Sequence, residues 1–267
     1  ERHLSFGSVR TYTSVIEDTM PGGYIPFILE ATALFPSEAT TFSTDFNTMY
    51  LSLIPENANS EKIFRADLTQ TGWKIDSEPL EICSGDHIYS HPCLSPDGKY
   101  LIFSSDMSGT KGGLDLFISW REGEKWTNPE NLGKNINSDG NELFSSLDRR
   151  NNLYFSSDGL PGEGGYDVFM CRFNGSGWEK PQNLTSAINT VDDELAFTIN
   201  KADHETAFYT SRTRSGRYRT QLFIIDLKPG MELVSNATLG DQFLALVGGN
   251  DQIPVPEKPD TVVQAVA

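Results

Sequence analysis

A repeat of 52 residues constrains the fold of this 267-residue chain more than any other feature. Residues 101–106 (LIFSSD) recur 52 positions later at 153–158 (LYFSSD), and residues 112–117 (GGLDLF) recur at the same spacing at 164–169 (GGYDVF). Later residues keep this spacing: Trp126 and Trp178, Pro129 and Pro181, Asn131 and Asn183, Asn137 and Asn189. Repetition at a fixed period indicates one structural unit that is used several times.

Two further copies flank this pair. Residues 154–157 (YFSS) recur at 208–211 (FYTS) after two additional residues, and residues 42–45 (FSTD) precede 94–97 (LSPD) by 52 positions. The copies are therefore placed near 38–89, 90–141, 142–193 and 194–235.

Each copy has the composition of a propeller blade. The second copy contains four short strand signals, near 91–95, 100–105, 114–119 and 125–132, and no helical periodicity. Four strands in about fifty residues are typical of one blade. A single blade cannot bury both faces, so recurring aromatic residues are expected to fill the space between blades. These residues are Phe103, Phe117, Phe155, Phe169, Tyr209 and Phe223.

We therefore expect an all-β domain over residues 1–250, a β-propeller of four-stranded antiparallel blades. Five blades are favoured and six are the alternative. Residues 1–37 and 236–250 would together form the closing blade, because joining the two chain ends in one blade removes exposed strand edges. Residues 251–267 are proline-rich at their start and indicate a linker or tail that leads to other domains of a longer chain.

Charge and motifs narrow the function classes. A formal net charge of −16 argues against sequence-independent nucleic-acid binding and against docking on an anionic membrane. The apolar runs are too short to span a bilayer, so direct membrane insertion is not expected. The chain has no Gly-x-Ser-x-Gly elbow and no phosphate-binding loop. We expect no enzyme activity and no cofactor, while Cys83, Cys93 and Cys171 leave the redox compartment open.

The repeat resembles a known family. Residues 95–106 (SPDGKYLIFSSD), followed by 112–117 (GGLDLF), resemble the WD-like propeller repeat of the TolB type. The variant in residues 164–189 is similar to the form found in cell-envelope proteins of the Bacteroidota, beside tetratricopeptide repeats and a peptidoglycan-binding OmpA-like domain, as in PorE-like components of the type IX secretion system. The resemblance covers residues 90–225 well and 38–89 loosely.

This resemblance implies a periplasmic scaffold domain that binds other proteins of the envelope. Association with the outer membrane would come through another part of the chain. The third clear copy departs from the pattern, because Arg212 and Gln221 stand where the other copies have Asp.

The loops 106–114, 158–166 and 211–220 join the second and third strands of three blades, so they should share one end of the propeller, here called the top face. Asp106, Asp158 and Asp167 either cap turns in these loops or contact a partner. A calcium site formed by Asp158, Glu163 and Asp167 is a weaker alternative, since the spacing matches no calcium loop.

The third top-face loop is basic, with Arg212, Arg214, Arg217 and Arg219 within eight residues. Guanidinium groups bind carboxylate or phosphate in a bidentate manner. The loop therefore either pairs with neighbouring acids or anchors an acidic partner.

Glu38, Glu142 and Glu194 recur at one repeat position, where the remaining copy has Ser90. We expect them at the mouth of the central channel, with an architectural role, a cation or acid–base chemistry as the possibilities. They motivate an alternative function, a carbohydrate-binding or glycoside-hydrolysing propeller. Cys83, His87, His91 and Cys93 have ligand types that suit zinc, but their spacing matches no zinc motif, so no metal is expected.

Overall fold

The computed structural model describes residues 12–17, 20–26, 34–55, 58–201, 204–214 and 220–227, with side chains described from residue 39 onward. Within these ranges almost all regular structure is antiparallel strand. One helical turn, α1 (Thr185–Ile188), is the exception.

Four sheets follow one another along the chain, and we call them blades 1 to 4. Their strands are β3 (Leu34–Phe42), β4 (Thr48–Pro55), β5 (Lys62–Thr69) and β6 (Gly72–Ile75) in blade 1; β7 (Tyr89–Leu94), β8 (Tyr100–Ser105), β9 (Asp115–Glu122), β10 (Lys125–Trp126) and β11 (Glu130–Asn131) in blade 2; β12 (Glu142–Leu147), β13 (Leu153–Ser157), β14 (Asp167–Cys171) and β15 (Gln182–Asn183) in blade 3; and β16 (Asp193–Ile199), β17 (Thr206–Arg212) and β18 (Thr220–Asp226) in blade 4.

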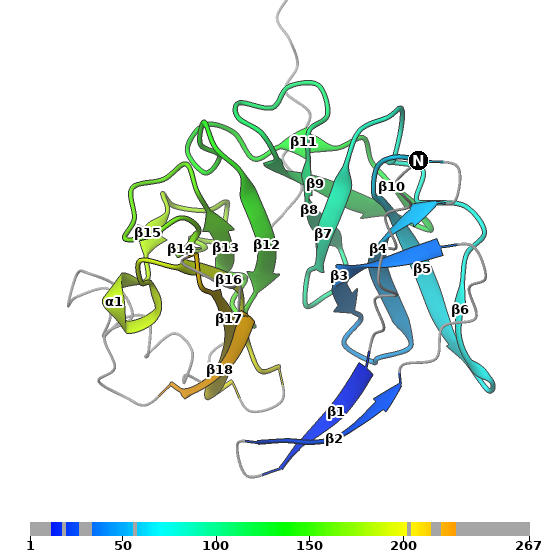
Figure 1. Ribbon diagram of the computed structural model, residues 1–267. Helices are drawn as coiled ribbons and strands as arrows, with labels where there is room; N and C mark the ends of the chain where they lie inside the picture. Colours follow the sequence, from blue (N-terminus) through cyan, green and yellow to red (C-terminus); the bar gives the residue numbers. More distant parts are fainter. Residues whose placement is uncertain are drawn as a thin grey trace, which may run out of the picture.

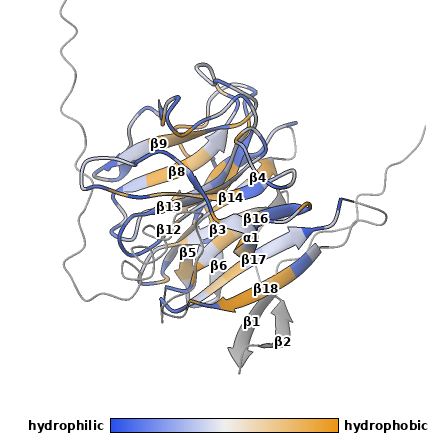
Figure 2. Cartoon of the chain, turned by 90° about the vertical axis from the view of Figure 1, so that its left-hand side faces the viewer, coloured by the Kyte–Doolittle hydropathy of each residue, from blue (hydrophilic) through white to orange (hydrophobic). Residues whose placement is uncertain are grey.

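The blades are arranged as in a propeller (Figure 1). Within each sheet the strands lie side by side in chain order. The first strands of successive blades are neighbours, β3 beside β7, β7 beside β12 and β12 beside β16, so they form the inner wall. Hydrophobic residues are concentrated in the strands, and the connecting loops are largely hydrophilic (Figure 2). The all-β propeller expected from the repeat is confirmed in this arrangement.

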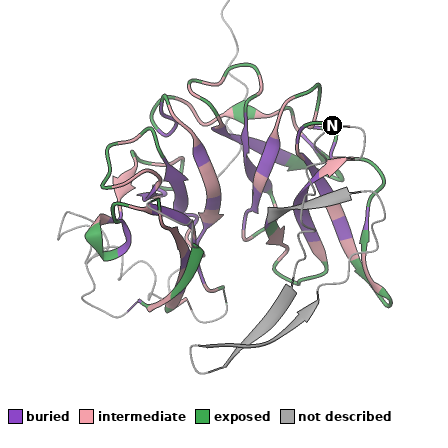
Figure 3. Ribbon diagram, viewed as in Figure 1, coloured by how far each residue is buried: buried purple, intermediate pink, exposed green. Residues whose placement is uncertain are grey.

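The described residues form four blades rather than the five or six that were expected. The N-terminal strands β1 (Tyr12–Glu17) and β2 (Met20–Pro26) pair with each other in a two-stranded sheet of the described residues. The other expected part of the closing blade, residues 236–250, lies outside the described residues. Blade 4 has three described strands, and its last strand, β18, is largely exposed (Figure 3).

The turn between the first two strands shows how the repeat encodes local structure. Ser95-Pro-Asp-Gly98 closes with a hydrogen bond from Gly98 N to Ser95 O at 2.9 Å, and Gly98 has a φ of 72°. Asp97 accepts hydrogen bonds from Ser95 Oγ at 2.8 Å and from Lys99 N at 3.2 Å. Proline and glycine satisfy the backbone of such a turn, and the aspartate side chain fixes it.

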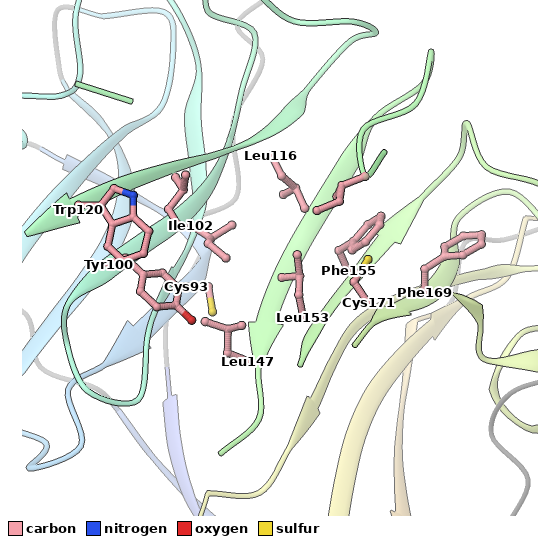
Figure 4. Packing of buried hydrophobic residues seen from close by; sticks show 12 residues of the cluster. Cys93, Tyr100, Ile102, Leu116, Trp120, Leu147, Leu153, Phe155, Phe169 and Cys171 are labelled. Carbon is pink, nitrogen blue, oxygen red and sulfur yellow. The ribbon is translucent and has the colours of Figure 1, made fainter. Parts of the chain in front are cut away.

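Apolar side chains from neighbouring blades pack into shared cores. Between blades 2 and 3 one cluster contains Ile102 and Leu116 from one side and Leu153 and Phe155 from the other (Figure 4). The aromatic residues expected between blades are there: Phe103 and Phe117 pack in the core that blades 1 and 2 share. The corresponding rings stack within blades 2, 3 and 4, in the pairs Phe103–Phe117, Phe155–Phe169 and Tyr209–Phe223, with centroids 6.2, 6.1 and 5.0 Å apart. Phe223 is the exception to the expected packing between blades, because it is 38% exposed among the described residues.

A backbone seam joins successive blades at the top face. Gly113 N donates to Gly140 O at 2.7 Å, and Glu142 N donates to Leu114 O at 2.7 Å, so the loop after β8 pairs with the loop before β12. The next seam repeats this pattern, with Gly165 N to Asp192 O at 3.2 Å and Glu194 N to Tyr166 O at 2.7 Å. The recurring Gly-Gly motif is therefore the place where one blade hydrogen-bonds to the next.

The seam requires glycine because the two backbones approach closely. A Cβ at Gly112 would lie 2.2 Å from Gly140 O, and one at Gly164 would lie 2.1 Å from Asp192 O. Buried asparagines hold the same loops from the other side. Asn137 Oδ1 accepts from Leu116 N at 2.9 Å, and Asn189 Oδ1 accepts from Val168 N at 2.8 Å.

We predict that Gly112→Ala destabilises the domain by about 1–3 kcal/mol, because the new methyl group overlaps a backbone carbonyl that cannot move without breaking the seam. Gly177→Ala is the matched control, since a Cβ there meets no atom within 4 Å. Urea denaturation of both variants measures the effect. Equal stability of the two variants would contradict a close-packed seam.

Candidate functional site

Asp106 and Asp158 occupy the same position in blades 2 and 3, at the top face. Asp106 Oδ1 accepts a hydrogen bond from Ile88 N, and Asp158 Oδ1 accepts one from Asn141 N, both at 2.7 Å. These N–H groups lie just before the inner strands β7 and β12. The two carboxylates therefore fix the entry of the inner strand in their own blade, and both side chains remain partly or fully exposed.

Asp167 serves its own loop. Its carboxylate accepts hydrogen bonds from Glu163 N and Gly164 N, both at 3.1 Å, and the residue is 1% exposed. Asp115 makes the same contacts in blade 2, with Lys111 N at 2.7 Å and Gly112 N at 3.2 Å. Burial raises the pKa of Asp167. This aspartate shapes the Gly-Gly loop and presents no carboxylate to a partner in this conformation.

Blade 4 reverses the charges of this arrangement. Arg212 stands at the position of Asp158 and donates to Asp193 Oδ2, with Nη2 at 2.9 Å and Nε at 3.2 Å. Asp193 in turn stands at the position of Asn141: Tyr166 N donates to Asp193 Oδ1 as Leu114 N donates to Asn141 Oδ1. The departure of the third clear repeat from the pattern is therefore a compensated exchange, in which the acid has moved to the inner strand.

The basic loop is partly committed to neighbouring acids. Arg214 Nε lies 3.5 Å from Asp193 Oδ1, and its backbone N–H donates to Asp192 Oδ1 at 3.1 Å. The Arg214 side chain is nevertheless 56% exposed. Arg217 and Arg219 lie outside the described residues. Of the four arginines expected to anchor a partner, Arg212 therefore forms an ion pair with Asp193, and Arg214 has a largely exposed side chain.

The strand register corrects the expected ring of three glutamates. The residues that pair with equivalent positions of the second strand are Pro36 with Leu53, Tyr89 with Ser105, Glu142 with Ser157, and Glu194 with Ser211. Only blades 3 and 4 therefore have a glutamate at this position. Glu38 falls within an irregular stretch of β3, and the side chain of Glu38 is outside the described part; Tyr89, and not Ser90, is the counterpart in blade 2.

Glu142 and Glu194 are buried and hold the loops that precede them. Glu142 accepts from Ser138 N at 3.1 Å, from Ser157 Oγ at 2.8 Å and from Ser138 Oγ. Glu194 makes the same three bonds, to Thr190 N at 2.8 Å, Thr190 Oγ1 at 2.7 Å and Ser211 Oγ at 2.9 Å. Both are 0% exposed, so they brace the seam from inside rather than facing the channel.

A cavity of about 510 Å³ lies on the propeller axis, between the inner strands. All four inner strands contribute to it, and its described wall contains five phenylalanines: Phe42, Phe46, Phe144, Phe197 and Phe208. Lys201 is the one residue with a permanent charge among the described lining residues, and none of these is an acid. Glycoside hydrolysis uses two carboxyl groups, and the described wall supplies neither.

Each inner strand is interrupted where it lines this cavity. The register shifts between Ser90 and Cys93, between Leu143 and Ser146, and between Leu195 and Thr198. Within these bulges three non-glycine residues adopt a left-handed backbone: His91 with φ 50°, Phe144 with φ 52° and Ala196 with φ 57°. A bulge redirects side chains, so the three corresponding residues all line the cavity.

The cysteine and histidine residues considered for zinc have separate roles: Cys83 and Cys93 pack in hydrophobic clusters, His91 lines the axial cavity, and His87 lies 3.5 Å from Asp106 at the surface. Within the ranges that the structure describes, no group of three or more His, Cys, Asp or Glu residues could hold a metal ion. Burial raises the pKa of Cys83 to about 11 and that of Cys93 to about 12, and it lowers the pKa of His91 to about 4. All three described cysteines are free thiols.

Sequence reasoning missed the axial bulges. A left-handed backbone is usually signalled by glycine or asparagine, and these positions hold His91, Phe144 and Ala196. The signal for the charge reversal was present in Arg212, but its partner Asp193 could be identified only from the pairing of β16 with β17.

No protein-family model matches the sequence, and comparison with curated proteins finds no relative. Solved structures do match. A TolB protein from Agrobacterium tumefaciens is 14% identical with a TM-score of 0.51, over 84% of this chain and 75% of the other. Two weaker likenesses are an α-L-arabinofuranosidase from Lactobacillus brevis, 11% identical with a TM-score of 0.47 over 77% and 78% of the chains, and hydrazine synthase from Kuenenia stuttgartiensis, 15% identical with a TM-score of 0.47 over 90% and 65%.

The match to TolB shows the fold, a TolB-like β-propeller. At 14% identity this likeness shows the fold alone and assigns no activity. Among the described residues, no helix has both the length and the apolar character needed to cross a membrane.

We predict that Arg212→Asp destabilises the domain by about 2 kcal/mol, because the new carboxylate then faces the nearly buried carboxylate of Asp193 without a cation between them. Adding Asp193→Asn should recover most of this loss, since the pair then copies Asp158 and Asn141 of blade 3. Urea denaturation of the single and double variants tests the exchange. A double variant no more stable than Arg212→Asp would show that the two positions are not equivalent.

We predict a pH dependence for the buried Glu142. Burial raises the pKa of this carboxyl in the folded state, so its contribution to stability is full below the unfolded pKa and is lost as the pH rises through the folded pKa. The stability of Glu142→Gln relative to the native chain should therefore increase between pH 4.5 and pH 7. Urea denaturation across this range measures the difference, and a constant or falling difference would contradict the assignment.

Proposed function

We propose that this chain is a non-catalytic protein-interaction domain that acts as a scaffold in a periplasmic cell-envelope assembly. One observation carries the proposal: the polar residues that recur with the repeat form hydrogen bonds within the chain. Asp115, Asp167, Glu142 and Glu194 all shape or brace the seam loops. Recurring residues that hydrogen-bond within the chain give a rigid framework, and an interaction domain uses such a framework to present its loops.

The likeness to the TolB fold and the resemblance of residues 90–225 to envelope repeats support the periplasm as the compartment. On the same grounds the type IX secretion system is the assembly to test first. Attachment to the outer membrane and to peptidoglycan would come from other parts of a longer chain.

We place the partner-binding surface on the top face, around the basic loop. Arg214 is exposed there, and Arg217 and Arg219 follow in the sequence. Asp106 and Asp158 keep exposed carboxylates at the corresponding positions of blades 2 and 3. A basic loop on a chain of net charge −16 favours a partner with an acidic patch that contacts this loop, and the exposed aspartates of blades 2 and 3 disfavour an acidic patch at their positions.

A carbohydrate ligand is the second candidate, favoured by the phenylalanine and hydroxyl groups in the axial cavity. A lectin would bind at that cavity and leave the basic loop free. The two functions therefore predict different sites on the same domain.

We predict that an Arg217→Glu, Arg219→Glu bait loses envelope proteins that the native domain captures. The two substitutions do not change the ion pair between Arg212 and Asp193, so the fold should be preserved. The bait is compared with the native domain and with a Lys74→Glu, Lys125→Glu control, which reverses two exposed charges outside the top-face loops. Captured proteins are identified from solubilised envelope extract by mass spectrometry.

Proteins lost from the arginine variant alone would support the top-face partner site. Identical captures from all three baits would remove the basic loop from the interface. A native domain that captures no protein but binds immobilised glycans would replace the scaffold function with the carbohydrate one.

A further inference from the structure

The axial cavity has features of a small-molecule site that the scaffold function does not require. Its volume of about 510 Å³ lies within the range of ligand pockets. It is walled by residues from every blade, so its shape depends on the whole propeller.

The bulges of the inner strands place rings on the cavity wall. His91 of blade 2 and Phe144 of blade 3 lie with ring centroids 4.0 Å apart, in corresponding left-handed positions. A left-handed backbone is unfavourable for residues other than glycine. The fold therefore holds two rings in contact at the axis, with their planes tilted by 53°, in spite of local strain.

Blade 4 has no ring at the corresponding position. Ala196 adopts the same backbone, with φ 57° against 52° at Phe144, and it lines the same cavity. The series His91, Phe144, Ala196 thus has two rings and one methyl group. The space that a third ring would occupy beside Phe144 is available to a planar ring of a ligand.

One charged group on the wall defines the rest of the ligand. Lys201 carries the one permanent charge of the described lining, and its Nζ contacts only a backbone carbonyl there, Phe42 O at 3.5 Å. The described wall contains no acid that would neutralise this ammonium group.

We propose that the axial cavity binds a small planar aromatic carboxylate, with its ring against Phe144 in the space beside Ala196 and its carboxylate toward Lys201. Aromatic side chains prefer offset stacking or edge contact with such a ring. The ammonium group of Lys201 supplies charge complementarity. This site is separate from the basic loop on the top face, so one can fail without the other.

The probe is 2-naphthoate, and its uncharged analogue 2-naphthylmethanol has the same ring without the carboxylate. Isothermal titration calorimetry and saturation-transfer NMR measure binding to the full 267-residue chain. The native chain should bind 2-naphthoate saturably and more tightly than 2-naphthylmethanol. Lys201→Gln should weaken 2-naphthoate about fivefold and leave 2-naphthylmethanol unchanged, as expected for one partly exposed ion pair.

Ala196→Phe should abolish binding of both probes, because it fills the ring position with a side chain that blade 3 already accommodates in the same backbone. Phe144→Leu removes the stacking ring and should weaken both probes, which keeps the site testable if Ala196→Phe does not fold. Lys74→Gln, on the outer strand β6, is the control and should bind like the native chain.

Three results would overturn the proposal. The native chain could fail to bind 2-naphthoate at millimolar concentration. A folded Ala196→Phe variant could bind both probes as tightly as the native chain, which would place them elsewhere. Equal affinities for the two probes, unchanged in Lys201→Gln, would refute the anionic ligand class.

Discussion

The hydrogen-bonded seam between successive blades is the constraint on which the rest of this structure depends. Its bonds, from Gly113 N to Gly140 O and from Gly165 N to Asp192 O, join loops that are distant in the sequence. Around it the chain arranges two glycines with no room for a Cβ, aspartates that close the Gly-Gly loops, and glutamates that brace the following loops. Burial of these charged groups is tolerated because each oxygen has partners. Once the seams fix the angle between blades, apolar cores and the axial cavity follow from it.

Much of the fold could be predicted from the sequence, because the repeat spacing, the strand lengths and the turn at Ser95-Pro-Asp-Gly98 are local properties. The partner strand of residues 1–37 could not, because strand pairing is set by long-range packing and leaves no mark at a fixed spacing. Among the described residues, β1 pairs with β2. The closing blade itself stays a prediction, because residues 236–250 lie outside the described part of the chain.

The candidate site was predictable only in part. Residue type and spacing located the Gly-Gly loops and Arg212, but the sequence could not show that Asp193 completes the charge reversal. The glutamate ring was wrong because the turn after β12 is one residue shorter than the turn after β7, which makes Tyr89 the counterpart of Glu142. In blade 1 the irregular stretch of β3 contains one further residue, which makes Pro36 the counterpart. The rings of His91 and Phe144 line the cavity because their backbone is left-handed, and neither residue type predicts that conformation. Repeat arithmetic identifies which residues recur, and only the register shows what they contact.

Amide hydrogen exchange tests most directly the central claim that the recurring motif is an internal seam. The amides of Gly113, Glu142, Gly165 and Glu194 all donate across the seams. If the account is right, these four amides exchange only through global unfolding, with free energies of opening that equal the unfolding free energy from urea denaturation. Exchange of these amides at the rate of exposed loops would contradict the account, and the Gly-Gly loops would then be free surface loops available to a partner.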